Sequence, residues 1–159
     1  MANEMKKMIR MMASDGKEVV VEEAVAMKSE IIRHMIEDNF TEDVIPIPNV
    51  TASVLSNIFD YCKKHMDFLP EFEELEDFDN KFVDIDTDAL YDLIMVNNYP
   101  SSSSNYLGVK DLIDLICKKV ANIIRWKTPE EIRQIFKIEN DFTPEEEEKI
   151  RKEHAWAFE

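Results

Sequence analysis

One run of side chains in the 159-residue sequence could bind a metal ion. Asp84-Ile85-Asp86-Thr87-Asp88 has the alternating carboxylates with which a calcium-binding loop begins. Such a loop needs glycine at its sixth position for a sharp turn and glutamate at its twelfth as a bidentate ligand. Those positions hold Ala89 and Met95. We therefore interpret the run as the acidic start of a helix and expect no bound metal.

Nucleophilic and acid–base chemistry has little support in the sequence. Cys62 falls on the apolar stripe of a predicted helix, and Cys117 has no histidine near it. The three histidines share no metal-ligand spacing: His34, His65 and His154. No GxSxG or HExxH motif is present. An acid hydrolase would need a carboxylate pair in a pocket, and the sequence singles none out. We expect no enzymatic activity and no cofactor.

The composition excludes further classes of function. The chain carries 34 acidic and 19 basic side chains, a net charge of −15, which disfavours binding to nucleic acid and to anionic membranes. Its two glycines, Gly16 and Gly108, are too few for a GxGxxG motif and too far apart for a P-loop. We find no apolar run long enough to span a membrane and no signal peptide. We therefore expect a reducing compartment, the nucleus and cytoplasm, with both cysteines as free thiols.

The elements that would position a binding surface begin with a β-hairpin over residues 8–21. Apolar residues alternate on both sides of the turn sequence Ser14-Asp15-Gly16. Helical spacing predicts a helix over Lys28–Glu37 and a longer one over Ala52–His65. Between them, Val44–Pro48 is predicted to be extended, and its two prolines favour an edge or parallel position in a sheet.

Residues 67–88 contain ten acidic side chains and one basic side chain, Lys81, and so contribute −9 to the net charge. Acids this dense repel one another and usually form a solvated loop. Phenylalanines interleave them at a spacing that also suits a short helix: Phe68, Phe72, Phe78 and Phe82. The pattern alone leaves both interpretations open.

Helices are predicted next at about 88–97 and 109–125, on either side of Pro100 and four serines. Thr128-Pro129-Glu130-Glu131 and Thr143-Pro144-Glu145-Glu146 then place threonine at the N-cap, proline at the first helical position and glutamate at the third. The second of these helices, about 144–155, has charged pairs four residues apart and one aliphatic residue, Ile150.

The C-terminal third has more apolar residues than such short helices can bury among themselves. They are Ile132, Ile135, Phe136, Ile138, Phe142, Trp156 and Phe158. An ordinary helical core is one interpretation. Aromatic side chains at the chain end, after a highly charged helix, favour a second one, a hydrophobic groove that binds a helical partner.

Several motifs occur in order along nearly the whole chain. They are Ser14-Asp15-Gly16, Val44-Ile45-Pro46-Ile47-Pro48-Asn49-Val50, Asn105-Tyr106-Leu107, Lys127-Thr128-Pro129-Glu130-Glu131-Ile132-Arg133, Asn140-Asp141-Phe142-Thr143-Pro144-Glu145-Glu146-Glu147-Glu148 and Trp156-Ala157-Phe158-Glu159. Together they resemble the Skp-type adaptor subunit of SCF (cullin–RING, F-box) ubiquitin ligases, and the ending resembles the plant branch of that family.

The resemblance implies a BTB/POZ fold for residues 5–125, an α-rich α/β domain with a small N-terminal sheet, and a C-terminal helical extension at 127–159. It implies a non-catalytic adaptor that bridges a cullin, with its RING subunit, to F-box proteins, so that substrates are ubiquitinated and degraded by the proteasome. The acidic stretch at about 67–79 corresponds to a variable acidic loop of the family, which favours the loop interpretation there.

The resemblance also assigns binding residues. The F-box protein would contact Ile116, Val120, Ile124, Ile132, Ile135, Phe136, Ile138, Phe142 and Trp156. The cullin would contact Asn105 and Tyr106, with Tyr61 and Lys64 as further candidates.

Two departures from the family pattern bear on these assignments. The family has a single Asn-Tyr-Leu, whereas here Asn98-Tyr99 precedes Pro100 and four serines, and Asn105-Tyr106 follows them. The alternative is therefore a divergent F-box-binding scaffold that has lost cullin binding through the serine-rich insertion. Trp126 stands where the family usually has glycine, so we expect the turn there to be reshaped.

Overall fold

The computed structural model describes residues 6–40, 43–67, 72–97 and 107–157. The chain forms two compact units that divide between Ile123 and Ile124, called unit 1 and unit 2 below. The domain boundary expected from the sequence, between residues 125 and 127, stays a prediction. The described residues are rich in helices and have one small sheet near the N-terminus, which confirms the predicted α-rich α/β class.

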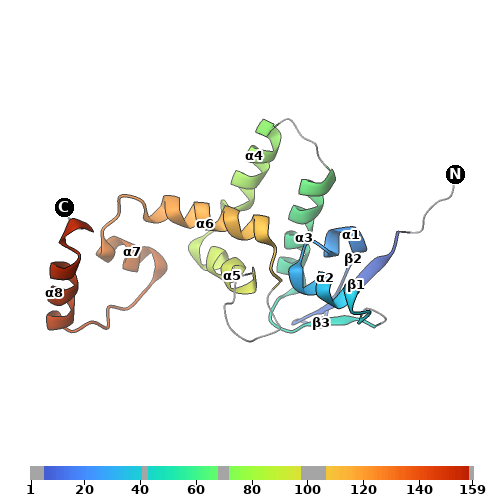
Figure 1. The fold of residues 1–159 in the computed structure, drawn as a ribbon, viewed down its shortest axis with the longest axis horizontal. Coiled ribbons are helices and arrows are strands. Elements are labelled where there is room, and N and C mark those ends of the chain that lie inside the picture. The colour runs from blue at the N-terminus through green and yellow to red at the C-terminus, as the bar shows by residue number, and fades with distance from the viewer. Residues whose placement is uncertain (1–5, 41–42, 68–71, 98–106, 158–159) are drawn as a thin grey trace. The chain divides into compact units, whose positions relative to one another are not determined.

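The sheet of unit 1 consists of β1 (Met8–Ala13), β2 (Glu18–Glu22) and β3 (Ile45–Ile47), in the order β2-β1-β3 (Figure 1). β1 pairs antiparallel with β2, which confirms the predicted hairpin. The turn between them places Gly16 at φ +73°, a conformation that glycine adopts without strain. β3 lies at the edge and parallel to β1, where Pro46 disturbs no central ladder.

Unit 1 contains the helices α1 (Glu23–Ala26), α2 (Glu30–Glu37), α3 (Ala52–Asp67), α4 (Phe72–Phe82), α5 (Thr87–Asn97) and α6 (Lys110–Ile124), except that the last residue of α6 already belongs to unit 2. Four of them match predicted helices to within about two residues. α1 was not predicted, because four residues are too short for a periodic pattern. α2 begins at Glu30 because Ser29 is its N-cap, accepting a hydrogen bond from the backbone N–H of Ile32 at 3.4 Å.

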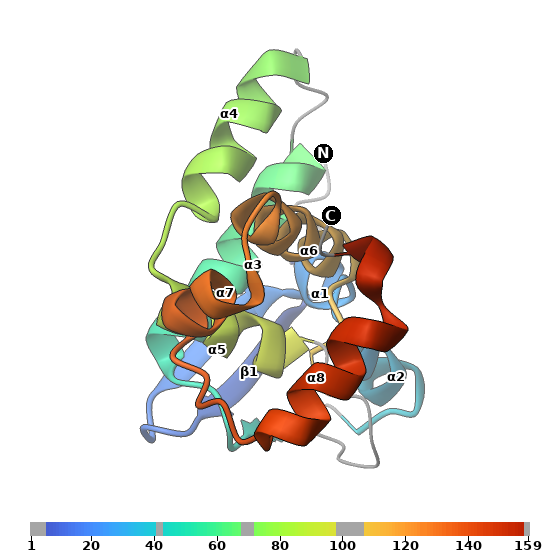
Figure 2. The same cartoon turned by 90° about the vertical axis from the view of Figure 1, so that its left-hand side faces the viewer.

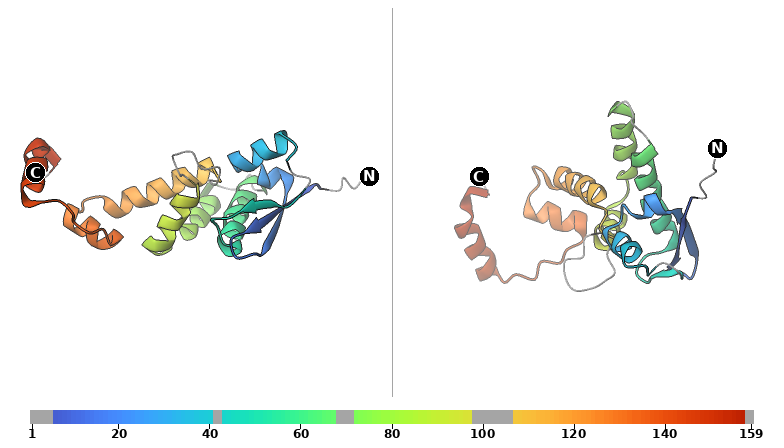
Figure 3. Two further views of the ribbon diagram at one scale, coloured as in Figure 1. Left: turned by 90° about the horizontal axis from the view of Figure 1, so that it is seen from below. Right: turned by 45° about the vertical axis from the view of Figure 1, so that its right-hand side comes forward.

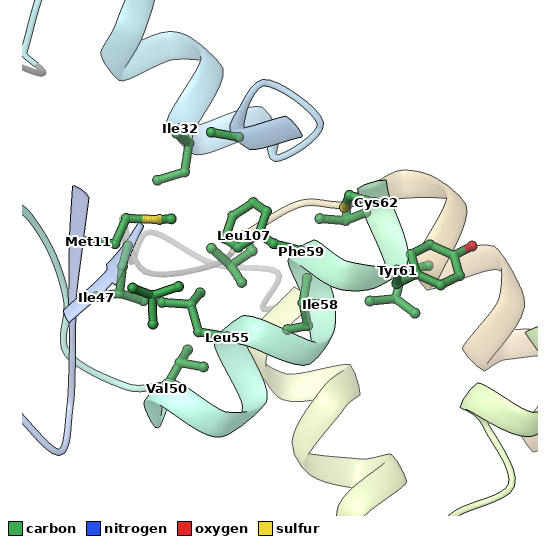
Figure 4. Close-up of a cluster of buried hydrophobic side chains, with 14 of the residues drawn as sticks. Met11, Ile32, Ile47, Val50, Leu55, Ile58, Phe59, Tyr61, Cys62 and Leu107 are labelled. Carbon is green, nitrogen blue, oxygen red and sulfur yellow. The ribbon is translucent and has the colours of Figure 1, made fainter. Parts of the chain in front are cut away.

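The core of unit 1 lies between the sheet and the apolar face of α3 (Figure 4). Leu55 and Ile58 on α3 are fully buried, together with Met11 from β1 and Ile32 from α2. Leu107 closes the same core, and its carbonyl accepts a hydrogen bond from the buried Ser29 hydroxyl. Segments far apart in the sequence therefore share one core.

The acidic segment is helical over most of its length, so the prediction of a loop at about 67–79 is wrong there. Residues 68–71 lie outside the described part of the chain, but Phe72–Phe82 form α4, which runs beside the end of α3 (Figures 1 and 2). The rings of Phe78 and Phe82 lie 6.4 and 5.1 Å from the ring of Tyr61 on α3. A third contact joins His65 Nε2 to Asp79 Oδ1 at 2.6 Å. These contacts outweigh the repulsion among acids that face solvent.

Unit 2 contains α7 (Pro129–Phe136), α8 (Pro144–Glu153) and the 3-10 turn η1 (Ala155–Ala157), with an extended segment between α7 and α8 (Figure 3). Both predicted capping boxes are confirmed. Thr128 Oγ1 accepts from the Glu131 N–H at 3.3 Å, and the Glu131 carboxylate accepts from the Thr128 N–H at 2.8 Å. Thr143 and Glu146 repeat this exchange at 3.2 and 2.9 Å.

Thr143→Ala should destabilise α8 by about 1 kcal/mol, because the Glu146 N–H loses its acceptor. Hydrogen exchange of the α8 amides should accelerate accordingly, while α7 serves as the internal reference. Thr128→Ala is the matched control and should instead accelerate exchange in α7. Unchanged exchange in both variants would show that the caps contribute nothing to the ordering of these helices.

The turn that follows α6 keeps a left-handed conformation, so the reshaping expected for it is wrong. Trp126 lies at φ +62°, and the Lys127 N–H donates to the Ile124 carbonyl at 3.2 Å. This backbone conformation usually closes a helix with glycine, and sometimes with asparagine. With a tryptophan it costs about 1–2 kcal/mol.

Candidate functional site

Unit 2 has apolar side chains, and the described ones all remain at least partly exposed. No described side chain from Ile124 to Ala157 is buried. The exposed fraction is 38% for Ile124, 55% for Ile138, 47% for Phe142 and 75% for Trp156. Ile132, Ile135 and Phe136 are half-buried. Since burial of apolar surface is the main driving force for packing, this unit has apolar area available to a second molecule.

The local structure explains why these side chains stay uncovered. Ile132, Ile135 and Phe136 recur at helical spacing and so share one face of α7. α8 offers this face almost nothing apolar, because its body is charged apart from Ile150. Unit 2 therefore has a folded backbone and an incomplete core.

Polar contacts join α7 to α8 in place of a core. Arg151 Nη2 lies 2.7 Å from Glu130 Oε1, and Arg133 Nη1 lies 3.9 Å from Glu147 Oε1. A backbone N–H lowers the pKa of Glu130, and the Arg151 guanidinium lowers it further. Two of the charged pairs expected within α8 are also present, from Glu147 to Arg151 at 3.5 Å and from Glu148 to Lys152 at 2.8 Å. Ion pairs that water can reach, such as these, stabilise a fold weakly.

Two of the predicted F-box contacts lie in unit 1. Ile116 is 1% exposed and belongs to the core, and Val120 is half-buried against that core. The Ile116 side chain therefore offers no surface to a partner in this conformation. The apolar stripe of α6 could not reveal this, because a stripe that faces a core and one that faces a groove have the same spacing.

The four predicted cullin contacts differ in whether the structure describes them and in how exposed they are. Asn105 and Tyr106 lie outside the described residues. Tyr61 is 2% exposed, with its ring 4.3 Å from that of His65, and burial raises the pKa of its hydroxyl. Lys64 is half-buried, with Nζ 5.8 Å from the centre of the Phe78 ring. Of these candidates, Lys64 is the one whose position at the α3–α4 contact is both described and partly accessible.

A hollow of about 390 Å³ adjoins Tyr61. Tyr61, Cys62 and Val109 line it with buried side chains, and the exposed Lys28 and Lys110 are among its other lining residues. Burial raises the pKa of the Cys62 thiol to about 12. The thiol is therefore protonated at neutral pH and is a poor nucleophile.

The acidic run at 84–88 begins a helix, as interpreted from the sequence. The Asp86 carboxylate accepts a hydrogen bond from the Ala89 N–H at 2.8 Å at the start of α5. Within the described ranges, no three His, Cys, Asp or Glu side chains are placed to hold a metal ion. Nor does any helix in that part of the chain have the length and apolar character to cross a membrane.

Comparison with known proteins relates both ends of the chain to one family. Residues 7–67 match the family model described as "Skp1 family, tetramerisation domain", and residues 110–157 match "Skp1 family, dimerisation domain". The chain is 47% identical to SKP1-like protein 1 of Oryza sativa subsp. japonica over 97% of its own length and 96% of the relative. It is 49% identical to SKP1-like protein 11 of Arabidopsis thaliana, over 96% of this chain and 98% of the relative.

Proposed function

Since the chain belongs to the Skp1 family, we propose that it bridges F-box proteins to a cullin with its RING subunit in an SCF ubiquitin ligase. Family membership makes it a non-catalytic SCF adaptor with a BTB/POZ-type domain and F-box-binding capacity. To act as this bridge, the chain must bind the F-box protein and the cullin at the same time. Substrates on the F-box protein would then be ubiquitinated and degraded by the proteasome.

The observation that carries the proposal is the incomplete core of unit 2. Its helices are capped and joined by ion pairs, yet none of its described side chains is buried. Such a surface suits an F-box helix that supplies the missing apolar layer. We propose Ile124, Ile132, Ile135, Phe136, Ile138, Phe142 and Trp156 as its contacts from unit 2, with Val120 on the helix before it.

We propose that Asn105, Tyr106 and Lys64 contact the cullin. The alternative is an F-box-binding scaffold whose serine-rich insertion, within residues 99–106, abolishes cullin binding. For either form we propose the nucleus and cytoplasm as the location, because Cys62 and Cys117 are both free thiols, as is usual in a reducing compartment.

Separate binding experiments with the full chain distinguish these possibilities. We expect co-purification with a cullin–RING complex and, independently, with an F-box peptide. Binding of the F-box peptide alone would support the scaffold, and binding of neither would overturn the adaptor proposal. Hydrogen exchange should show new protection in residues 127–157 when the F-box peptide is added.

A further inference from the structure

Trp126 combines a strained backbone with an uncovered side chain. Its φ is +62°, a region that bulky side chains rarely occupy, and its exposed fraction is 91%. An indole so exposed gains almost nothing from the hydrophobic effect within the chain. Folding of the isolated chain therefore supplies no reason for a tryptophan here. Strained backbone conformations cluster at functional sites, so a strained residue that does not stabilise the fold is a candidate for a functional role.

The other non-glycine residues at positive φ, among those described, are easier to explain. Asn39, at φ +59°, ends α2, and asparagine tolerates this conformation because its short side chain hydrogen-bonds locally. Lys137, at φ +55°, is the C-cap of α7, and its side chain is long, polar and exposed. Of these three described residues, Trp126 is the one that exposes a large apolar side chain.

The neighbours of Trp126 define the chemistry of a partner. The Arg125 guanidinium carbon lies 5.7 Å from the centre of the Trp126 ring, within the range of a cation–π contact. Arg125 and Lys127 are both exposed, and neither has an ion-pair partner among the described residues. In a chain with a net charge of −15, this is a local basic island around an exposed aromatic ring. An acidic segment with an apolar side chain complements it.

We propose that Trp126 is a specificity-determining anchor for F-box proteins, selecting those whose F-box segment places an apolar pocket beside acidic side chains. This inference rests on the proposed function. Trp126 precedes the N-cap of α7 by two residues, so it continues along the chain from the exposed apolar set of unit 2. Tryptophan and arginine are the residues most often found to dominate binding energy at interfaces.

The test separates stability from binding with the variant Trp126→Gly. Glycine relieves the backbone strain, so the melting temperature should rise, while the affinity for an F-box peptide bearing acidic side chains should fall about fivefold. Lys137→Gly is the matched control, because it relieves the same kind of strain after α7. It should also raise the melting temperature but change the affinity less than twofold.

The basic flanks give a second readout. Replacing Arg125 and Lys127 together by glutamine should flatten the salt dependence of binding and bring the affinity for acidic and neutral F-box peptides together. If Trp126→Gly is more stable and binds as tightly as the wild type, Trp126 is idle and the inference is overturned. If the wild type itself binds no F-box peptide, the proposed function fails as well.

Discussion

Phe59→Ala is expected to destabilise unit 1 by about 3–5 kcal/mol, the usual loss when a phenylalanine is removed from a packed core. Phe59 is 2% exposed and lies on α3 among side chains from the sheet, from α2 and from the segment at Leu107 (Figure 4). Removing the Phe59 ring leaves a cavity. The surrounding elements cannot move in to fill it, because other contacts hold each of them in place. Since a domain is typically stable by only about 5–15 kcal/mol, the variant should lie close to unfolding.

Urea denaturation followed by circular dichroism measures the effect of Phe59→Ala. Asn57→Ala is the matched control, because Asn57 lies two residues away on the exposed face of α3, and it should change the free energy of unfolding by less than about 0.5 kcal/mol. A loss below 1 kcal/mol for Phe59→Ala would mean that the core around α3 is much looser than the structure shows.

The features that the sequence predicts well are those whose cause is local. The hairpin follows from alternation around Ser14-Asp15-Gly16, and α7 and α8 follow from two capping boxes that need only residues one turn apart. The edge position of β3 follows from Pro46, which has no N–H for a central ladder. In each case the residues that decide the outcome are neighbours in the chain.

The features that the sequence misses depend on distant residues. α4 is a helix because Phe78 and Phe82 meet Tyr61 on α3, a pairing that no local pattern encodes. The analogy with a variable acidic loop then favoured the wrong alternative. The positive φ of Trp126 was missed for the opposite reason, because local strain there was expected to reshape the turn and did not.

The candidate binding surface could be predicted from the sequence in part. The excess of apolar residues in the C-terminal third could be counted from the sequence, and the structure leaves those of the described part unburied. Which apolar residues belong to a core could not be decided in advance. Ile116 and Ile124 share the stripe of α6, yet one is 1% exposed and the other 38%. Tyr61 shows the same difficulty on α3, where its ring is buried against α4.

Trp156→Ala should weaken F-box binding by more than 1 kcal/mol, and by about 2 kcal/mol, roughly thirtyfold, if the indole is fully desolvated by the partner. Trp156 is 75% exposed in η1, and the ring of His154 meets it edge-on at 6.4 Å between centroids. An indole held by so little within unit 2 contributes little to its folding. Most of its apolar area is therefore free to be buried by an F-box helix.

Fluorescence titration with an F-box peptide lacking tryptophan measures this loss, because Trp126 and Trp156 are the two tryptophans of the chain. Wild-type emission should shift to the blue on binding, as an indole leaves water. Lys152→Ala, on the exposed and highly charged body of α8, is the matched control and should change the affinity less than twofold. The Trp156→Ala variant should keep its α8 exchange rates, since no described side chain of that helix is buried. An unchanged affinity would mean that the C-terminal aromatic takes no part in the complex, and that the surface of α7 alone holds the F-box.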